Sequence, residues 1–86
     1  MNMNLKELVE KFFQVGDYIQ PDMDTRLEEF KQKTGIDYQY VNIFSNVGGF
    51  WAMVYFLGKD YKVKMFVDGD DLGHFVRAIE IEEYGE

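Results

Sequence analysis

Several residue types that carry common chemistry are absent or scarce in this chain. Its 86 residues include no cysteine, one proline, one serine and one histidine. The lack of cysteine excludes disulfides and cysteine-ligated metal centres, and it agrees with a reducing compartment. The longest apolar stretch, FWAMVYFL at 50–57, is far shorter than the roughly 20 residues that a membrane-spanning helix needs. The N-terminus also lacks a signal-peptide layout, so we expect a cytoplasmic protein without a membrane partner.

Catalytic motifs are scarce as well. A Ser–His–Asp triad would require Ser45, His74 and one aspartate to meet in space, and Ser45 is more simply explained as a turn residue. The NVGG sequence at 46–49 lacks the glycine spacing and the following helix of a phosphate-binding loop. We therefore expect no enzymatic activity and no cofactor.

The charge of the chain is acidic and unevenly distributed. Its net charge of −7 comes from 16 acidic and 9 basic residues. Residues 68–86 hold seven acids and one base (−7 + 1 = −6), so most of the excess lies in this C-terminal segment. Phosphate backbones repel such a surface, which argues against direct nucleic-acid binding. A basic protein, possibly a nucleic-acid-binding enzyme, is the partner that this charge favours.

The hydrophobic residues predict one folded domain spanning residues 1–86. They make up 47% of the chain, and aromatic residues alone make up 17%. Asn4 is placed to cap a first helix whose apolar positions recur at helical spacing and which Gly16 ends. A second helix follows Pro21 and ends at Gly35, with a Thr25–Glu28 capping box and Glu28–Lys31 and Glu29–Lys33 surface pairs. The first helix is expected to use Leu5, Leu8, Val9, Phe12 and Phe13, and the second Met23, Leu27 and Phe30.

From Ile36 the apolar period changes to two, which predicts three antiparallel strands. A Gly58–Lys59 turn would pair Leu57 with Asp60, and a four-residue turn at 46–49 would pair Ser45 with Phe50. In this register one sheet face is aliphatic and packs on the helices. That face carries Val41, Ile43, Phe50, Ala52, Val54, Phe56, Tyr61, Val63, Met65 and Val67. The opposite face gathers Tyr38, Tyr40, Phe44, Trp51, Tyr55 and Phe66 beside Lys62 and Lys64, and a slip of one residue would exchange the two faces.

The segment from Asp71 to Tyr84 is compatible with two structures. Leu72, Phe75, Val76 and Ile79 match a helix face, whereas the alternation around Ile79 and Ile81 matches an edge strand. The helix, ending near residue 80, is favoured. The expected fold is therefore α+β, with two N-terminal helices packed on one face of a three-stranded antiparallel sheet and a C-terminal helix (or edge strand). This order contains the αβββα order of double-stranded-RNA-binding domains, but DGDDLGHF at 68–75 is acidic where those domains are basic, so that activity is not expected.

The stretch VDGDDLGH at 67–74 is the densest group of potential ligands. Asp68, Asp70, Asp71 and His74 could bind a divalent metal or a small ligand, but their spacing matches neither an EF-hand loop nor a zinc site. A turn at Asp68–Gly69 followed by an aspartate that caps a helix explains the same residues, and we expect no metal site.

Two surfaces therefore remain as candidates for binding: the acidic C-terminal segment and the aromatic sheet face. The leading hypothesis is a non-enzymatic protein-binding module, in particular a small inhibitor whose carboxylates occupy a basic nucleic-acid-binding surface of its target. In profile, being small, acidic and rich in aromatic residues, the chain is similar to phage-encoded inhibitors such as anti-CRISPR proteins, although no motif carries this similarity. A homo-oligomeric structural protein of a virus or mobile element, associating through the aromatic face, is the alternative. The expected partner-binding residues are Asp68, Asp70, Asp71, Glu80, Glu82, Glu83, Trp51, Tyr55, Tyr38 and Tyr40.

Overall fold

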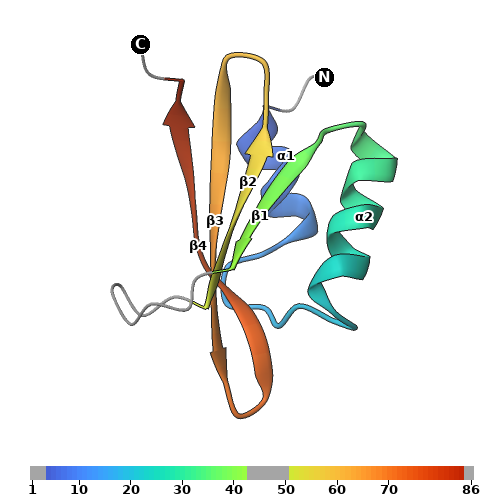
Figure 1. Ribbon diagram of the computed structural model, residues 1–86, viewed down its shortest axis with the longest axis vertical. Coiled ribbons are helices and arrows are strands. Elements are labelled where there is room, and N and C mark those ends of the chain that lie inside the picture. The colour runs from blue at the N-terminus through green and yellow to red at the C-terminus, as the bar shows by residue number, and fades with distance from the viewer. Residues whose placement is uncertain (1–3, 43–50, 85–86) are drawn as a thin grey trace.

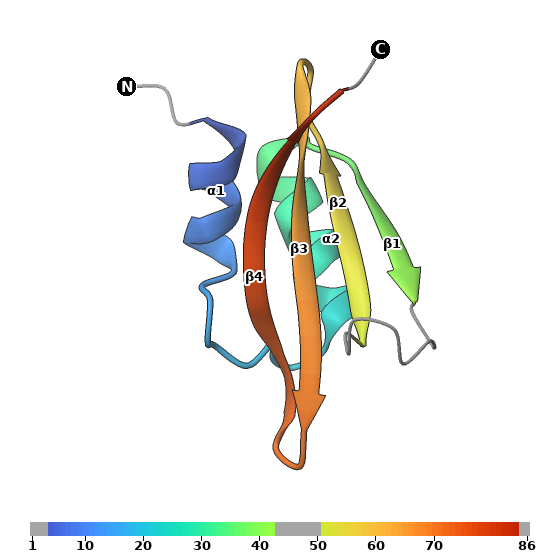
Figure 2. The same cartoon turned by 90° about the vertical axis from the view of Figure 1, so that its left-hand side faces the viewer.

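The protein is an α+β structure in which two helices pack on one face of a four-stranded antiparallel sheet (Figures 1 and 2). The computed structural model describes residues 4–42 and 51–84. Its strands lie in the order β1-β2-β3-β4, so β1 and β4 form the edges. Within the described residues, no helix covers the second face, and none is long and apolar enough to cross a membrane. The elements are α1 (Leu5–Phe12), α2 (Met23–Thr34), β1 (Tyr38–Asn42), β2 (Ala52–Leu57), β3 (Tyr61–Asp70) and β4 (Gly73–Glu83).

Helix α1 begins as its sequence predicts, whereas the predicted Thr25–Glu28 capping box is wrong because α2 is capped three residues earlier, at Asp22. The Asn4 side chain caps α1 by accepting a hydrogen bond from the Glu7 N–H at 2.8 Å, and Asp22 caps α2 by accepting from the Thr25 N–H at 2.7 Å. Helix α2 ends at Gly35, whose left-handed backbone (φ 75°) costs a glycine little. Helix α1 ends earlier than predicted, at Phe12, and the chain then turns at Gln14–Asp17, where the Asp17 N–H donates to the Gln14 carbonyl at 3.0 Å.

Aromatic side chains from α2, from β2 and from the residue that follows α1 fill the centre of the core. Phe13, Phe30 and Phe56 are almost completely buried, and the rings of Phe30 and Phe56 meet edge to face with centroids 4.7 Å apart. Such contacts stabilise the fold beyond what the burial of each ring provides. This extra stabilisation is important because a domain this small buries little surface. The remaining buried residues are Leu5, Val9, Ile19, Met23, Leu27, Ala52, Val54, Val63, Met65, Val67, Val76 and Ile79.

The pairing of β2 with β3 preserves the predicted faces but not the predicted register. Leu57 lies opposite Lys62, not Asp60, and the Gly58 N–H donates to the Tyr61 carbonyl at 3.0 Å across a longer connection. The register is therefore displaced by two residues. Because side chains alternate with period two, this displacement leaves Ala52, Val54 and Phe56 on the helix side.

The pairing of β1 with β2 differs from the prediction by one residue, and this difference exchanges the faces of β1. Tyr38 lies opposite Phe56 and Tyr40 opposite Val54, so both tyrosines pack against the core. Val41 lies opposite Met53 on the uncovered face. The aromatic face predicted from the sequence is therefore wrong in its β1 members. The predicted positions of Ile43, Phe44, Ser45 and Phe50 lie outside the described residues.

The C-terminal segment is an edge strand, and the favoured helix is wrong. Strand β4 pairs with β3 through a hairpin in which Asp70 lies opposite Gly73, so the turn is at Asp71–Leu72, not at Asp68–Gly69. The strand has a register shift opposite Phe66 and Val67, and this bulge places both Val76 and Ile79 on the core side. Two buried residues three positions apart imitate the spacing of a helix, which explains the incorrect prediction.

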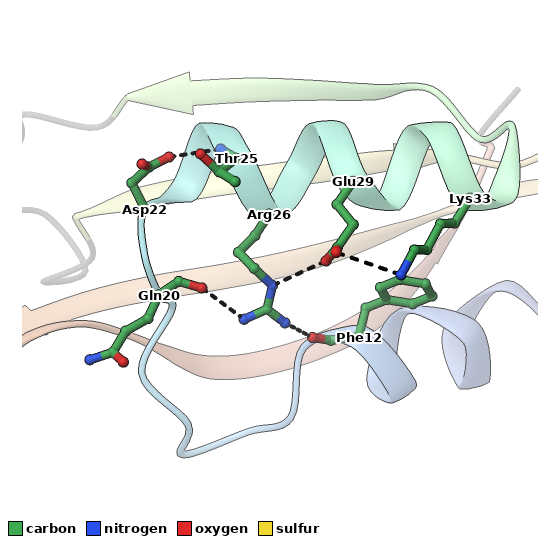
Figure 3. A network of polar contacts seen from close by, with 7 residues as sticks. All are labelled: Phe12, Gln20, Asp22, Thr25, Arg26, Glu29 and Lys33. Carbon is green, nitrogen blue, oxygen red and sulfur yellow. Dashed lines mark hydrogen bonds and ion pairs between the residues drawn. The ribbon is translucent and has the colours of Figure 1, made fainter.

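The segment between the helices is held in place by Arg26 (Figure 3). Its guanidinium donates to the carbonyls of Phe12 and Gln20 and lies 5.1 Å from the centre of the Phe13 ring. One side chain of α2 thus fixes the end of α1 and the connection that follows it. The same connection pairs with β4, because the Ile19 N–H donates to the His74 carbonyl at 2.8 Å.

Candidate functional site

A groove opens at the end of the sheet where the helix connection, β1 and the β3–β4 hairpin converge. Its volume is about 750 Å³, within the range of small-ligand sites. We call it the aromatic groove. Its described lining residues are Tyr18, Ile19, Gln20, Pro21, Asp22, Met23, Asp24, Thr25, Tyr40, Trp51, Leu72, Gly73 and His74.

Trp51 is the central aromatic residue of this groove. Its indole stacks on the His74 imidazole, with ring centroids 3.6 Å apart and an interplanar angle of 22°. Tyr40 meets the indole edge to face at 6.2 Å. The Trp51 backbone is also fixed, because its N–H donates to the Val67 carbonyl at 2.8 Å. The groove therefore has a wall of rings whose positions are set by contacts from three strands.

Tyr18 forms another aromatic part of the lining, and Asp70 holds it in place. The Tyr18 hydroxyl donates to the Asp70 carboxylate at 2.6 Å, and its ring contacts Phe75 edge to face. This hydrogen bond raises the pKa of Tyr18 and lowers that of Asp70, whose other oxygen accepts from the Leu72 N–H. The tyrosine thus stays neutral and the aspartate ionised around neutral pH.

The groove carries negative charge, and its described lining contains no lysine or arginine. Asp22 and Asp24 both belong to the lining, and the backbone N–H of Thr25 lowers the pKa of Asp22. Burial and, to a smaller extent, the charge of Asp24 raise the pKa of Tyr40. Arg26 lies nearby in sequence but donates to the carbonyls of Phe12 and Gln20. The groove is therefore both aromatic and anionic.

The carboxylates predicted to form one surface fall into two groups on β3 and β4. Asp68, Asp70 and Asp71 lie near the hairpin, and Glu82 lies toward the opposite end of β4, roughly 20–27 Å away at the usual rise of a strand. Asp68 is paired with Arg77 at 2.9 Å. Glu80 and Glu83 belong to the far group with Glu82.

Glu82 is partly neutralised by the neighbouring strand. It accepts from Lys64 at 2.9 Å and from Lys62 at 3.2 Å. Both contacts lower the pKa of Glu82, with the hydrogen bond from Lys64 contributing most. Asp70 and Asp71 therefore lie at the end of the molecule that contains the groove, which we call the groove end. Asp68 and Glu82 instead form ion pairs with basic residues of the same sheet.

The predicted aromatic residues also separate. Trp51 and Tyr40 enter the groove, but Tyr38 donates to Glu28 of α2 at 2.6 Å on the helix side. Tyr55 lies on the opposite, uncovered face, where the Lys62 ammonium sits 4.6 Å from its ring centre. Val41, Met53, Phe66 and Ala78 form a row of neighbours across this uncovered face.

The divalent-metal alternative finds no geometric support in the described part of the chain. No group of three potential ligand side chains there is arranged to hold an ion. Asp68 pairs with Arg77, Asp70 accepts from Tyr18, and the His74 ring stacks on Trp51.

Sequence reasoning missed the contribution of the helix connection. Tyr18, Asp22 and Asp24 converge with Trp51 only through a long-range pairing of this connection with β4. The signal available was modest: a tyrosine, a proline and two aspartates within residues 18–24, close to one sheet end if the connection crosses it.

Comparison of the chain with protein-family models, with curated proteins and with solved structures gives no match.

Proposed function

We propose that this protein is a non-enzymatic module that binds a basic protein partner through the end of the molecule containing the aromatic groove. The observation that carries the proposal is the combination of Trp51 and Tyr40 with Asp22 and Asp24 in one groove whose described lining has no lysine or arginine. Aromatic residues are enriched where protein partners bind tightly, and carboxylates steer a basic partner toward them.

Further acids extend the negative surface beyond the groove itself. Asp71 is exposed in the hairpin turn next to Leu72, a lining residue that is 78% exposed. Asp70 stays ionised beside Tyr18. A basic partner that approaches this end thus meets carboxylates around the rim of the groove and aromatic rings inside it. The carboxylates attract the partner, and the rings provide a surface of defined shape.

Inhibition of a nucleic-acid-binding protein is a narrower form of this proposal. It requires carboxylates that compete with phosphates for a basic surface. The acids at the groove end suit that role better than the complete predicted set, because Asp68 and Glu82 already contact bases of their own sheet. We therefore assign recognition to the groove end alone.

The proposal is tested with two double variants of equal charge. Asp24→Asn/Asp71→Asn alters the groove end, and Glu80→Gln/Glu83→Gln alters the far end of β4; each changes the net charge from −7 to −5 (−7 + 2). Immobilised wild-type protein and both variants are used to capture partners from a host lysate, followed by elution with rising salt. We expect a salt-sensitive partner that the far-end variant retains and the groove-end variant loses. Equal loss from both variants, or a complex indifferent to salt, would overturn the proposal.

Self-association through the uncovered sheet face is a second candidate. The half-buried row of Val41, Met53, Phe66 and Ala78 favours it, because an apolar row across a whole sheet face is a natural contact surface. Light scattering over a range of protein concentrations tests it. A mass that rises with concentration and falls in Met53→Lys supports self-association, and a constant monomer mass rejects it.

A further inference from the structure

We infer that the aromatic groove is a receptor for the guanidinium group of an arginine side chain on the partner. This inference rests on the proposed function, which it makes more specific. The groove combines flat aromatic rings, carboxylates and a volume of about 750 Å³, large enough for a complete arginine side chain and part of its backbone.

The aromatic wall suits a planar cation. Trp51 and Tyr40 contact each other edge to face, with centroids 6.2 Å apart, so they form one continuous aromatic wall against which a flat group can lie. The imidazole of His74 stacks against the indole and limits how far the indole can turn. Arginine stacks on aromatic faces more readily than lysine because its guanidinium is flat, delocalised and weakly hydrated.

The carboxylates supply the opposite charge. Asp24 is exposed at the first turn of α2, and Asp22 uses one oxygen to accept from the Thr25 N–H. The positive end of the α2 dipole opposes a cation here, but it is equivalent to only about half a charge, against two full carboxylates. A guanidinium can donate two parallel hydrogen bonds to one carboxylate, which fixes its orientation as well as its charge.

Other ligand classes fit this combination less well. Phosphate-containing ligands, including nucleotides, would meet Asp22 and Asp24 with no lysine or arginine in the described lining to offset the repulsion. An uncharged aromatic ligand could stack but would leave the negative charges of Asp22 and Asp24 uncompensated. A lysine ammonium would use the charge, but it lacks the flat surface that the rings match.

The single tryptophan makes the groove directly observable. Because Trp51 is the chain's only tryptophan, its fluorescence reports binding in the groove without a label. The protein is titrated with N-acetyl-arginine amide, with the lysine analogue, and with N-acetyl-citrulline amide, a neutral compound of nearly the same shape as arginine. We expect a saturable change of Trp51 emission with arginine, a weaker response with lysine and none with citrulline.

Two variants assign the response to the groove. Asp24→Asn removes an exposed charge and should weaken arginine binding about two- to fivefold, as expected for a partly solvated ion pair of 0.5–1 kcal/mol. The control Glu83→Gln removes one charge at the far end of β4 and should leave binding unchanged. Two-dimensional NMR spectra confirm that both variants fold.

Each outcome decides between named alternatives. Equal binding of citrulline and arginine, or no emission change with any of the three compounds, would overturn the guanidinium assignment; tighter binding of lysine would replace guanidinium with ammonium. Retention of a salt-sensitive, Asp24-dependent partner without arginine binding would remove this inference but keep the proposed function. Arginine binding without any such partner would keep the guanidinium assignment of the groove and remove the proposed function.

Discussion

Trp51 and His74 stack face to face at 3.6 Å although they belong to different parts of the sheet, one preceding β2 and the other within β4. The contact joins the two sides of the aromatic groove across β3. It also gives the chain's only histidine a structural partner that its sequence position, next to three aspartates, did not suggest.

Removal of this stack should reduce stability and change the tryptophan signal. We expect His74→Ala to lower the free energy of unfolding by about 1 kcal/mol, the usual value of an aromatic pair beyond its buried area. The emission of Trp51 should shift because the imidazole no longer covers one face of the indole. Urea denaturation followed by fluorescence measures both effects. His74→Phe keeps a flat ring and should retain most of the stability, and an equal loss in both variants would contradict the stacking role.

Arg26 should contribute more to stability than an ordinary surface arginine. Arg26→Ala removes the donors to Phe12 and Gln20 and the contact with the Phe13 ring, so we expect a loss of about 1–3 kcal/mol. Lys33→Ala is the matched control, because Lys33 forms an exposed pair with Glu29 worth about 0.5 kcal/mol or less. Chemical denaturation of the two variants compares them. Similar losses would show that Arg26 does not hold the helix connection in place.

Acid should destabilise the fold through its hydrogen-bonded carboxylates. Thr25 lowers the pKa of Asp22, Tyr18 lowers that of Asp70, and Lys64 lowers that of Glu82. Groups with a depressed folded pKa stabilise the protein above their ordinary pKa, and this stability is lost as pH falls through the folded value.

Thermal melts between about pH 7 and about pH 2 test this expectation. The midpoint should fall steadily on acidification. In Asp22→Asn the new side chain can still cap α2 but does not titrate, so the midpoint should fall less between neutral and acid pH. A fall as steep as that of the wild type would exclude a contribution from Asp22.

Tyr38 should titrate at an unusually high pH. Its hydrogen bond to Glu28, followed by burial, raises the pKa of Tyr38 to about 12. Because the neutral phenol is favoured in the folded state, its contribution to stability is present below the ordinary pKa of about 10 and is lost as pH rises toward 12.

NMR of the tyrosine ring carbons measures this pKa directly. Glu28→Gln should bring the pKa of Tyr38 down toward the ordinary value. Glu29→Gln, which alters the adjacent glutamate that contacts Arg26 and Lys33, should not. If Tyr38 titrates normally in the wild type, β1 does not pack against α2 as described.

The sequence predicted the features that depend on neighbouring residues. Helix caps at Asn4 and Gly35 are local, and so is the alternation that places Val54 and Phe56 in the core. The register of β1 was not predictable in the same way, because it depends on how residues 43–50 connect two strands. An error of one residue there was enough to move Tyr38 and Tyr40 from one face to the other.

The candidate site was predicted less well than the fold for a related reason. Trp51 and Tyr40 were recognised as binding candidates, but their neighbours Tyr18 and Asp24 reach them only through tertiary pairing of the helix connection with β4. The bulge in β4 gave Val76 and Ile79 the spacing of a helix, so the strand that completes the groove was assigned incorrectly. Long-range pairing decided both features.

Strand β4 is an edge strand, and its glutamates therefore have an effect that is separate from recognition of a partner. Residues 16–19 cover the backbone of the first half of the strand by pairing with His74 and Val76, but no described segment covers the second half in that way. Glu80, Glu82 and Glu83 lie along that half. Because like charges repel, Glu80 and Glu83 disfavour the pairing of this edge strand with the edge strand of a second molecule.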